Sequence, residues 1–229
     1  MSEKKEKLII IGDSAFAEIA YEYFTHDSHY EVVCFTADKE FIKKDSLFNV
    51  PIVPFEDIEK KYPPSNHKVF TALTYGKMNR VRKHFYERAK EKGYKFATYI
   101  SSKAFVWRNV TVGENSFIFE NNVVQPFVKI GNNVVLWSGN HIGHHSTIKD
   151  HCFFASHVVL SGFCEVQEYC FVGVNATIAN NVTIKKNCLI GAGATILKDT
   201  EEAKTYGSKM TIPKETDTLT FFEVEESER

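Results

Sequence analysis

An aliphatic residue, replaced once by Phe, returns at every sixth position between Val106 and Ile196 without a break. The positions are Val106, Val112, Ile118, Val124, Ile130, Leu136, Ile142, Ile148, Phe154, Leu160, Val166, Val172, Ile178, Ile184, Ile190 and Ile196. Chance would place an apolar residue at only about one position in three. A period of six fits neither an α-helix nor the alternation of a plain strand, so it predicts a repeat fold.

A parallel β-helix with triangular coils suits this period. Each hexad would form one short side and its corner, and three hexads would form a coil whose aliphatic residues stack on the coil above. The position two residues before each aliphatic residue is small or compact, and it includes four of the five cysteines: Cys152, Cys164, Cys170 and Cys188. We expect these cysteines to fill the core. No CxxC spacing occurs, which disfavours a metal or disulfide role.

Residues 1 to about 100 show a different pattern. Apolar strands are expected at Lys7–Ile11, Tyr30–Thr36, Lys68–Leu73 and Phe96–Ile100, with a short extended piece at Pro51–Val53. Amphipathic helices are expected over Phe16–Phe24 and from Met78 to Ala89, the second ending at Gly93. The alternation predicts a small open parallel sheet, with a ligand crevice at the carboxyl ends of its strands.

The turn at Gly12 is the place where a phosphate would bind, because a strand-to-helix turn presents backbone N–H groups and a helix dipole. The motif is weak, since Gly12, Asp13 and Ser14 replace the GxGxxG fingerprint and Asp13 would repel a pyrophosphate. A tight turn that only starts a helix is the alternative. An NAD-dependent redox enzyme is disfavoured.

Composition limits the remaining possibilities. The 229 residues, 43% of them hydrophobic, are enough for one or two domains with a good core. A net charge of -1 without a Lys/Arg block disfavours nucleic acid and anionic membranes as partners. The longest apolar run near the N-terminus is only Leu8 to Ile11, so we expect no signal peptide, no membrane insertion and a cytoplasmic location.

A nucleotide-type α/β domain joined without a linker to a hexapeptide β-helix resembles the bacterial nucleotide-amino-sugar N-acetyltransferases of the hexapeptide-repeat superfamily. These are related to the bacillosamine-pathway and sialic acid O-acetyltransferases. The resemblance implies a Rossmann-like nucleotide-sugar-binding domain at 1–102, a left-handed β-helix acyltransferase domain at 103–200 and a C-terminal extension at 201–229. It also implies a homotrimer with active sites between neighbouring subunits, and a role in surface-glycan biosynthesis such as that of lipopolysaccharide or O-antigen.

The implied substrates are acetyl-CoA and a UDP- or dTDP-linked amino-deoxy sugar, acetylated at its C4 amino group. Relatives carry a GxGGH-like turn after the first strand, of which this chain keeps only Gly12. By position, the resemblance implies nucleotide-sugar contacts at Gly12, Asp13, Ser14, Phe16 and Tyr75.

Five of the nine histidines cluster in the repeat: His141, His144, His145, His151 and His157. Relatives place the catalytic base two residues after the aliphatic residue of a hexad, which here is His144. Transfer to an amine needs a group that takes up a proton, and an imidazole is suited to this. His145 stands where relatives often have a carboxylate, so we expect another group to orient His144. His141 is a candidate for binding the substrate or the thioester carbonyl, and His151 and His157 are expected at solvated edges or subunit contacts.

Acetyl-CoA is expected along the coils, where small residues let its pantetheine arm approach the backbone. The candidate CoA-binding residues are Trp137, Ala155, Gly162, Gly173, Val174, Gly191, Ala192 and Lys198. The stretch Tyr206 to Lys209 matches the place where relatives cover the adenine and phosphates. The alternative is that glycine simply suits the corners of the coils.

Three other functions are alternatives for a β-helix of this kind. A sugar O-acetyltransferase would use the same base on a hydroxyl. A γ-type carbonic anhydrase would need histidines an integral number of coils apart, which bind zinc. No histidine lies 18 or 36 residues after His141, His144 or His145, so we expect no metal. A non-catalytic scaffold or binding module built on the same stack stays open.

Overall fold

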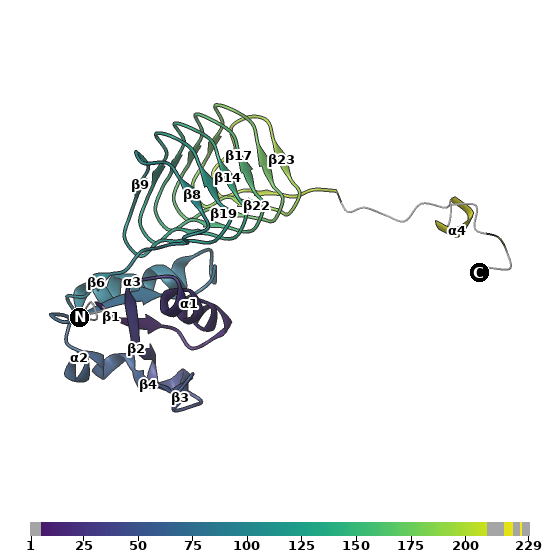
Figure 1. Ribbon diagram of the computed structural model, residues 1–229. Helices are drawn as coiled ribbons and strands as arrows, with labels where there is room; N and C mark the ends of the chain where they lie inside the picture. Colours follow the sequence, from purple (N-terminus) through teal and green to yellow (C-terminus); the bar gives the residue numbers. More distant parts are fainter. Residues whose placement is uncertain (1–5, 210–217, 222–224, 226–229) are drawn as a thin grey trace.

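The computed structural model describes residues 6–209, 218–221 and 225. It confirms a Rossmann-like α/β domain followed by a left-handed parallel β-helix, whose coils stand on the N-terminal domain (Figure 1). Of the C-terminal extension expected at 201–229, the described residues are 201–209, 218–221 and 225. No helix in the described ranges is long and apolar enough to cross a membrane.

The N-terminal domain holds one six-stranded sheet in the order β3-β4-β2-β1-β5-β6. Its elements are β1 (Glu6–Ile11), α1 (Ala15–His26), β2 (Tyr30–Ala37), η1 (Lys39–Phe41), β3 (Ser46–Leu47), β4 (Val50–Pro54), η2 (Phe55–Asp57), α2 (Ile58–Lys61), β5 (His67–Thr71), α3 (Arg80–Glu91) and β6 (Lys95–Phe96). All neighbouring strands are parallel except β3 and β4. The central strand β1 is fully buried from Leu8 to Ile11, as expected for a strand covered on both faces.

Different elements pack on the two faces of this sheet. Alternate β1 residues Ile9 and Ile11 pack in a core with Phe55 and Ile58 of η2 and α2 and with Ala89 of α3. On the other face, Leu8 and Ile10 share a core with Phe16 and Phe24 of α1 and with Phe117 of the β-helix. The second core therefore continues from one domain into the other.

The last predicted strand, Phe96–Ile100, is wrong as a single element. Lys95–Phe96 forms β6 in the N-terminal sheet, whereas Tyr99–Ile100 forms β7, the first strand of the β-helix. Tyr99 lies one coil before Phe117, and its amide donates to the Ser116 carbonyl at 2.9 Å. The second long helix begins at Arg80 rather than Met78, because Lys77, Met78 and Asn79 have positive φ angles. The domain boundaries proposed above stay predictions.

Three faces of two-residue strands build the β-helix, and they carry seven, six and five strands. Face 1 comprises β7 (Tyr99–Ile100), β10 (Phe117–Ile118), β13 (Val135–Leu136), β16 (Phe153–Phe154), β19 (Phe171–Val172), β22 (Leu189–Ile190) and β24 (Thr205–Tyr206). Face 2 comprises β8 (Phe105–Val106), β11 (Val123–Val124), β14 (His141–Ile142), β17 (Val159–Leu160), β20 (Thr177–Ile178) and β23 (Thr195–Ile196). Face 3 comprises β9 (Thr111–Val112), β12 (Lys129–Ile130), β15 (Thr147–Ile148), β18 (Glu165–Val166) and β21 (Thr183–Ile184).

From β7 to β20 each strand pairs with the strand 18 residues later, as in Val124 with Ile142 and Ile142 with Leu160, whereas β22 pairs with β24 after 16 residues. The hexad aliphatics from Ile118 to Ile196 are buried in one core, together with the four repeat cysteines. Burial of one such side chain contributes about 1.5–3 kcal/mol, so the stack is the main source of stability of this domain. The predicted coil and its inward column are confirmed.

The three corners are named by the faces that they join: corner 1–2, corner 2–3 and corner 3–1. From Asn115 to Gly193, the third residue after each hexad aliphatic has a positive φ, which turns the chain at the corner. Only four described glycines have positive φ, so most corners are made by Asn, His and aromatic residues. The helix α4 (Thr218–Phe221) follows the coils.

Candidate functional site

His144 and His145 lie side by side and exposed at corner 2–3, just after β14. Their Nδ1 atoms are 3.1 Å apart, and their rings are nearly perpendicular at 88°. The backbone amide of His144 donates to Oε1 of Gln125 at 2.9 Å, which ties this corner to the preceding coil. The expectation that another group orients His144 is therefore corrected, since His145 itself is the hydrogen-bond partner.

Two phenylalanines hold the His145 ring. The corresponding corner residues of the coils before and after it are Phe127 and Phe163, and their rings stack on His145 with centroid distances of 4.5 and 4.8 Å. All three residues have a positive φ, so their side chains leave the corner in the same direction. The sandwich restricts rotation of His145 and aims its Nδ1 at His144.

Gly162 is buried directly beneath the His144 ring. A Cβ at Gly162 would lie 2.8 Å from Cε1 and 2.9 Å from Nε2 of His144, closer than real contacts allow. The absence of a side chain at Gly162 thus permits the observed position of His144. The sequence placed Gly162 among CoA contacts, whereas in this chain its neighbour is the candidate base.

The Nδ1–Nδ1 contact restricts the protons on the pair. One Nδ1 must donate and the other accept, because two acceptors or two donors at this distance would repel each other. If His144 donates its Nδ1–H to His145, Nε2 of His144 keeps a free lone pair. No hydrogen-bond partner of this Nε2 occurs in the described part of the chain. The arrangement suits His144 for taking up a proton at Nε2.

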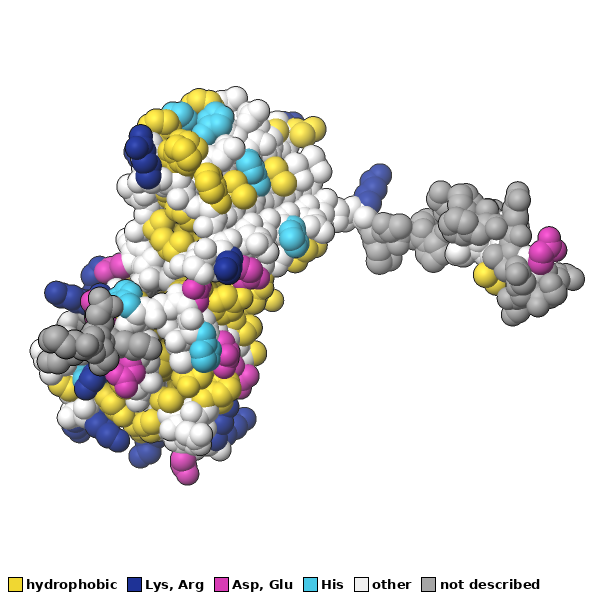
Figure 2. Space-filling view, viewed as in Figure 1, with side chains coloured by type: hydrophobic (Ala, Val, Ile, Leu, Met, Phe, Trp, Pro, Cys, Tyr) yellow, Lys and Arg dark blue, Asp and Glu magenta, His cyan; other side chains and the backbone are white. Residues whose placement is uncertain are grey.

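His141 lies on face 2, between Val123 and Val159 of the neighbouring coils. These two valines are 37% and 40% exposed, and the same side of the β-helix exposes Phe105, Trp107, Phe127 and Phe163. Figure 2 shows hydrophobic and histidine side chains gathered on the β-helix on the side away from the N-terminal domain. An apolar surface of this kind is typical of an interface.

The candidate CoA residues fall into three groups. Ala155, Gly173, Val174, Gly191 and Ala192 follow face 1 and form a column along corner 1–2. Gly207 and Ser208 continue this column, and the Ser208 hydroxyl donates to the Ala192 carbonyl at 2.7 Å. Gly162 and the exposed Lys198 instead belong to corner 2–3, on the other side of face 2.

Trp137 is the third group, and it lies between the domains beside Phe16. It follows β13 at corner 1–2, one coil before Ala155, and its ring centroid is 5.4 Å from Phe16 and 4.3 Å from Phe119. Phe16 is only 2% exposed within this aromatic cluster. Packing accounts for the buried Phe16 ring, whereas Trp137 is only partly buried, so its predicted contact with CoA stays a prediction.

The predicted nucleotide-sugar residues Gly12, Asp13, Ser14 and Tyr75 follow the carboxyl ends of β1 and β5. Gly12 is buried against the β5 end, where a Cβ would meet the Ala72 carbonyl oxygen at 2.9 Å. The Gly12 amide donates to the Thr36 carbonyl at 2.7 Å, so it is not available to a phosphate. Asp13, Ser14 and Tyr75 remain at least partly accessible, and Tyr75 is 51% exposed.

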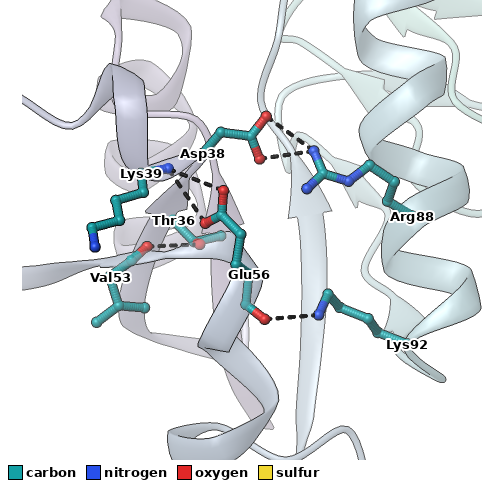
Figure 3. Close-up of polar contacts among 7 residues, drawn as sticks. All are labelled: Thr36, Asp38, Lys39, Val53, Glu56, Arg88 and Lys92. Atoms are coloured by element: carbon teal, nitrogen blue, oxygen red, sulfur yellow. Dashed lines mark hydrogen bonds and ion pairs between the residues drawn. The ribbon is translucent and has the colours of Figure 1, made fainter.

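The carboxylate that follows β2 is already paired. Asp38 accepts two hydrogen bonds from Nη1 of Arg88, at 2.7 and 3.0 Å, and Arg88 lies over the rings of Phe55 and Phe85. Beside it, Glu56 accepts from the Lys39 amide, and its carbonyl accepts from Lys92 (Figure 3). In dinucleotide-binding folds an acidic residue near this place binds the ribose. The Asp38–Arg88 pair therefore weighs further against an NAD site.

A cavity of about 430 Å³ opens where α1 meets the first coils, and the sequence did not indicate it. It is lined by Glu22, Tyr23, His26, Asp27, Ser101, Ser102, Lys103 and Glu120. Burial and a 2.6 Å hydrogen bond to Glu120 raise the pKa of Tyr23 to about 12, so this hydroxyl stays protonated as a donor. Residues from two domains form the cavity, so no local pattern marks it.

In the described ranges, no three His, Cys, Asp or Glu side chains are grouped so that they could hold a metal ion. The cysteines in these ranges are all buried and unpaired, and burial raises the pKa of Cys34 to about 12. A buried thiol with a raised pKa is a poor nucleophile, which agrees with a role in packing.

Three stretches, 109–142, 127–162 and 163–198, of which the first two overlap, match the family described as bacterial transferase hexapeptide (six repeats). No curated protein sequence matches the chain.

Solved structures share the complete two-domain fold. The acetyltransferase domain of PglB from Neisseria gonorrhoeae FA1090, in complex with acetyl coenzyme A, has a TM-score of 0.80 at 20% identity, covering 89% of this chain and 97% of that one. A histidine-to-asparagine variant of perosamine N-acetyltransferase from Caulobacter crescentus, with CoA and GDP-perosamine, has a TM-score of 0.79 at 20% identity, covering 88% and 93%. WeeI from Acinetobacter baumannii AYE has a TM-score of 0.66 at 19% identity, covering 86% and 94%.

Because these structures are only 19–20% identical to the chain, they show a common fold. The match to the hexapeptide family rests on the sequence of the repeats. Residues 109–198 thus match the hexapeptide repeat of bacterial transferases, and the chain has the two-domain fold seen in PglB and perosamine N-acetyltransferase.

Proposed function

We propose that the chain is an acetyl-CoA-dependent N-acetyltransferase acting on the amino group, at C4, of a nucleotide-linked amino-deoxy sugar. The observation that carries this proposal is the exposed His144, held through Nδ1 by His145 and left free at Nε2. The bound CoA and GDP-perosamine named for the Caulobacter structure support the choice of substrates. Surface-glycan biosynthesis is the proposed setting.

In the proposed reaction the sugar amine attacks the thioester carbonyl while Nε2 of His144 takes up a proton from the amine. The C–N bond forms, the C–S bond breaks, and the thiolate of CoA leaves with the proton that His144 held. No acyl-enzyme is formed. His145 accepts the Nδ1–H of His144 throughout and stabilises the imidazolium as a neutral hydrogen-bond acceptor, without the negative charge that a carboxylate would add.

The proposed acyl-CoA site is the column of small residues along corner 1–2, with Ala155, Gly173, Val174, Gly191 and Ala192. This column and His144 lie at opposite edges of face 2 within one chain. A homotrimer that covers the apolar face 2 would bring corner 1–2 of one subunit toward corner 2–3 of the next. The exposed Val123 and Val159 support this assembly, and light scattering tests it by the mass of the particle.

The proposed nucleotide-sugar site is the crevice at Asp13, Ser14 and Tyr75, next to face 1. Tyr75 offers an exposed aromatic ring for stacking on a base.

The test is a thiol-release assay with acetyl-CoA against UDP-, dTDP- and GDP-linked 3-amino and 4-amino sugars and their hydroxyl counterparts. CoA release with a 4-amino sugar alone is the expected result. Release with a hydroxyl sugar would instead make the chain an O-acetyltransferase. Silence across the panel, with no binding of CoA by calorimetry, would favour a scaffold.

A further inference from the structure

The link between β5 and α3 contains three successive residues in the left-handed region. Lys77, Met78 and Asn79 have φ angles of 50°, 53° and 65°. This conformation costs a residue other than glycine about 1–2 kcal/mol, and Lys and Met gain nothing from it locally. Such a run persists only where its surroundings hold it, and strain of this kind is concentrated at ligand sites.

Asn79 holds the end of this turn. Its side chain is fully buried, and Nδ2 donates to the carbonyl of Cys170 in the β-helix at 3.2 Å. Its backbone amide donates to the Tyr75 carbonyl at 3.1 Å and closes the turn. One residue therefore connects the turn to the neighbouring domain.

Arg82, one helical turn into α3, holds the start of the link. It is fully buried, and its Nε donates to Oδ1 of Asn133 at 2.9 Å, while Nη2 donates to the carbonyls of Asn133 and Cys152, both at 3.0 Å. Its Nη1 points to the carbonyls of Leu73 and Thr74, at 3.4 and 3.5 Å. The guanidinium also lies over the ring of Phe153.

The partners of Arg82 are carbonyl and amide oxygens, and no carboxylate bonds to it in the described part of the chain. Burial lowers the pKa of Arg82 to about 9. A buried charge without a counter-charge is destabilising unless its donors are satisfied, and an apolar side chain would join two domains at lower cost. An apolar residue, however, could not donate hydrogen bonds to the Leu73 and Thr74 carbonyls of the link.

The segment held in this way is the wall of the proposed nucleotide-sugar site. Thr74, Tyr75 and Lys77 are exposed on it. The Tyr75 ring lies 4.6 Å from Phe171 and 5.2 Å from Phe153, centroid to centroid, so it stands against face 1. We propose that Arg82 and Asn79 are positioning residues that hold residues 73–79 against the β-helix as one wall of the nucleotide-sugar site, and this rests on the proposed function.

The experiment measures binding by calorimetry with UDP, dTDP and GDP as one set of probes and CoA as the other. The variants are Arg82→Met, which keeps the length and loses the donors, Arg82→Lys, which keeps the charge, and Asn79→Gly, which favours the positive φ and loses the bond to Cys170. Tyr86→Phe is the control, because it removes another contact of α3 with the β-helix, the hydrogen bond to Glu114, which involves no residue of the link.

In folded Arg82→Met we expect nucleoside-diphosphate binding to weaken about tenfold or more, with unchanged binding of CoA, because the wall is displaced. Arg82→Lys should recover part of the loss. Asn79→Gly, which tests the idea even where Arg82→Met does not fold, should weaken binding about threefold through one lost hydrogen bond. Tyr86→Phe should bind as the wild type does.

Nucleotide affinity equal to wild type in Arg82→Met or in Asn79→Gly would overturn the positioning role and leave the proposed function intact. An equal loss in Tyr86→Phe would also overturn it, since domain docking in general would then explain the effect. A wild-type protein that binds CoA but none of the three nucleotides would overturn the nucleotide-sugar part of the proposed function, and the wall with it.

Discussion

His145 and His151 occupy the same place in successive hexads, three residues after Ile142 and Ile148. Their backbones are nearly identical, with φ angles of 59° and 62°. His145 is exposed at corner 2–3, whereas His151 is 8% exposed at corner 3–1, where α3 of the N-terminal domain docks. The expectation of a solvated edge is therefore wrong for His151.

The surroundings give the two imidazoles different chemistry. His145 lies between two phenylalanines and bonds to another histidine, whose Nε2 stays accessible. Nδ1 of His151 lies 2.9 Å from Nδ2 of Asn133, which lets it accept from this amide, and its ring stacks on Tyr169. Burial lowers the pKa of His151 to about 4 and keeps it neutral. A repeat position sets the direction of a side chain, and the packing around it sets its role.

The strongest test of this contrast is His144→Ala. Turnover should fall about 10²–10⁴-fold, because general-base catalysis is lost, while binding of CoA should persist. The matched change at the buried corner, His151→Asn, should leave turnover near wild type, since Asn occupies the same corner at Asn133 and Asn187. Thiol release and calorimetry measure both, and wild-type rates in His144→Ala would refute the assignment of the base.

A second test concerns the stability contributed by His151. Its folded pKa of about 4 lies below the ordinary 6.5, so below pH 6.5 the unfolded chain binds the proton first. The contribution of neutral His151 to the free energy of unfolding is fully present above that pH. About 2 kcal/mol of this free energy should be lost between pH 7 and 5.

His151→Asn should remove this part of the pH dependence in urea unfolding. The charged groups that act on His151 are Asp150, Arg82, Lys83 and Glu87, and they are unchanged in the variant. If the free energy of unfolding falls equally with pH in the wild type and in His151→Asn, His151 does not titrate as described.

The exposed pair is tested by two changes at His145. His145→Phe keeps the stack, since Phe127 and Phe163 hold the same corner position, but removes the acceptor for His144. We expect about tenfold lower turnover, equal to about 1.4 kcal/mol, with unchanged KM for acetyl-CoA.

His145→Asn offers an acceptor without the stack, and Asn181 shows that this corner accepts Asn. It should retain more activity than His145→Phe. If His145→Phe equals wild type in turnover and in its pH profile, His145 has no part in orienting His144.

The smallest effect is expected for Gly162→Ala. The new methyl group would meet the His144 ring at 2.8 Å, and the exposed ring can move by a few tenths of an ångström. Turnover should fall a few-fold, about 0.5–1 kcal/mol in the barrier, without loss of stability. Urea unfolding of the same variant is the control, because unchanged stability assigns a lower rate to His144 and not to the coil. A wild-type rate in Gly162→Ala would show that Gly162 does not set the position of His144.

Much of the fold follows from periodicity. The hexad frame predicted the coils, the inward cysteines and the corner position of His144, because stacking equal coils leaves only one register for the aliphatic column. The α/β pattern likewise predicted a parallel sheet. The break between β6 and β7 was missed, since an extended segment of five residues looks the same in one sheet or in two.

The candidate site was predictable only in part. Position in the hexad indicated His144 and the small column at corner 1–2. It could not show that Phe127 and Phe163 enclose His145, that Trp137 and Phe16 pack between the domains, or that Asp38 is paired with Arg88. Phe127, His145 and Phe163 lie one coil apart, so the hexad frame aligns them but does not fix how their rings stack. The other two contacts join residues whose separation is not a repeat.

The sequence by itself determined the direction of each side chain in the β-helix, inward, outward or at a corner, because a six-residue period and close-packed coils permit no other placement of the aliphatic residues. The tertiary structure decided which corner is covered and which is open. The N-terminal domain docks on face 1 and corner 3–1 through Arg82 and its aromatic core, and this buries His151. His144 and His145 stay exposed because the other domain does not dock on corner 2–3. The repeat pattern of the sequence does not indicate which surface the other domain covers.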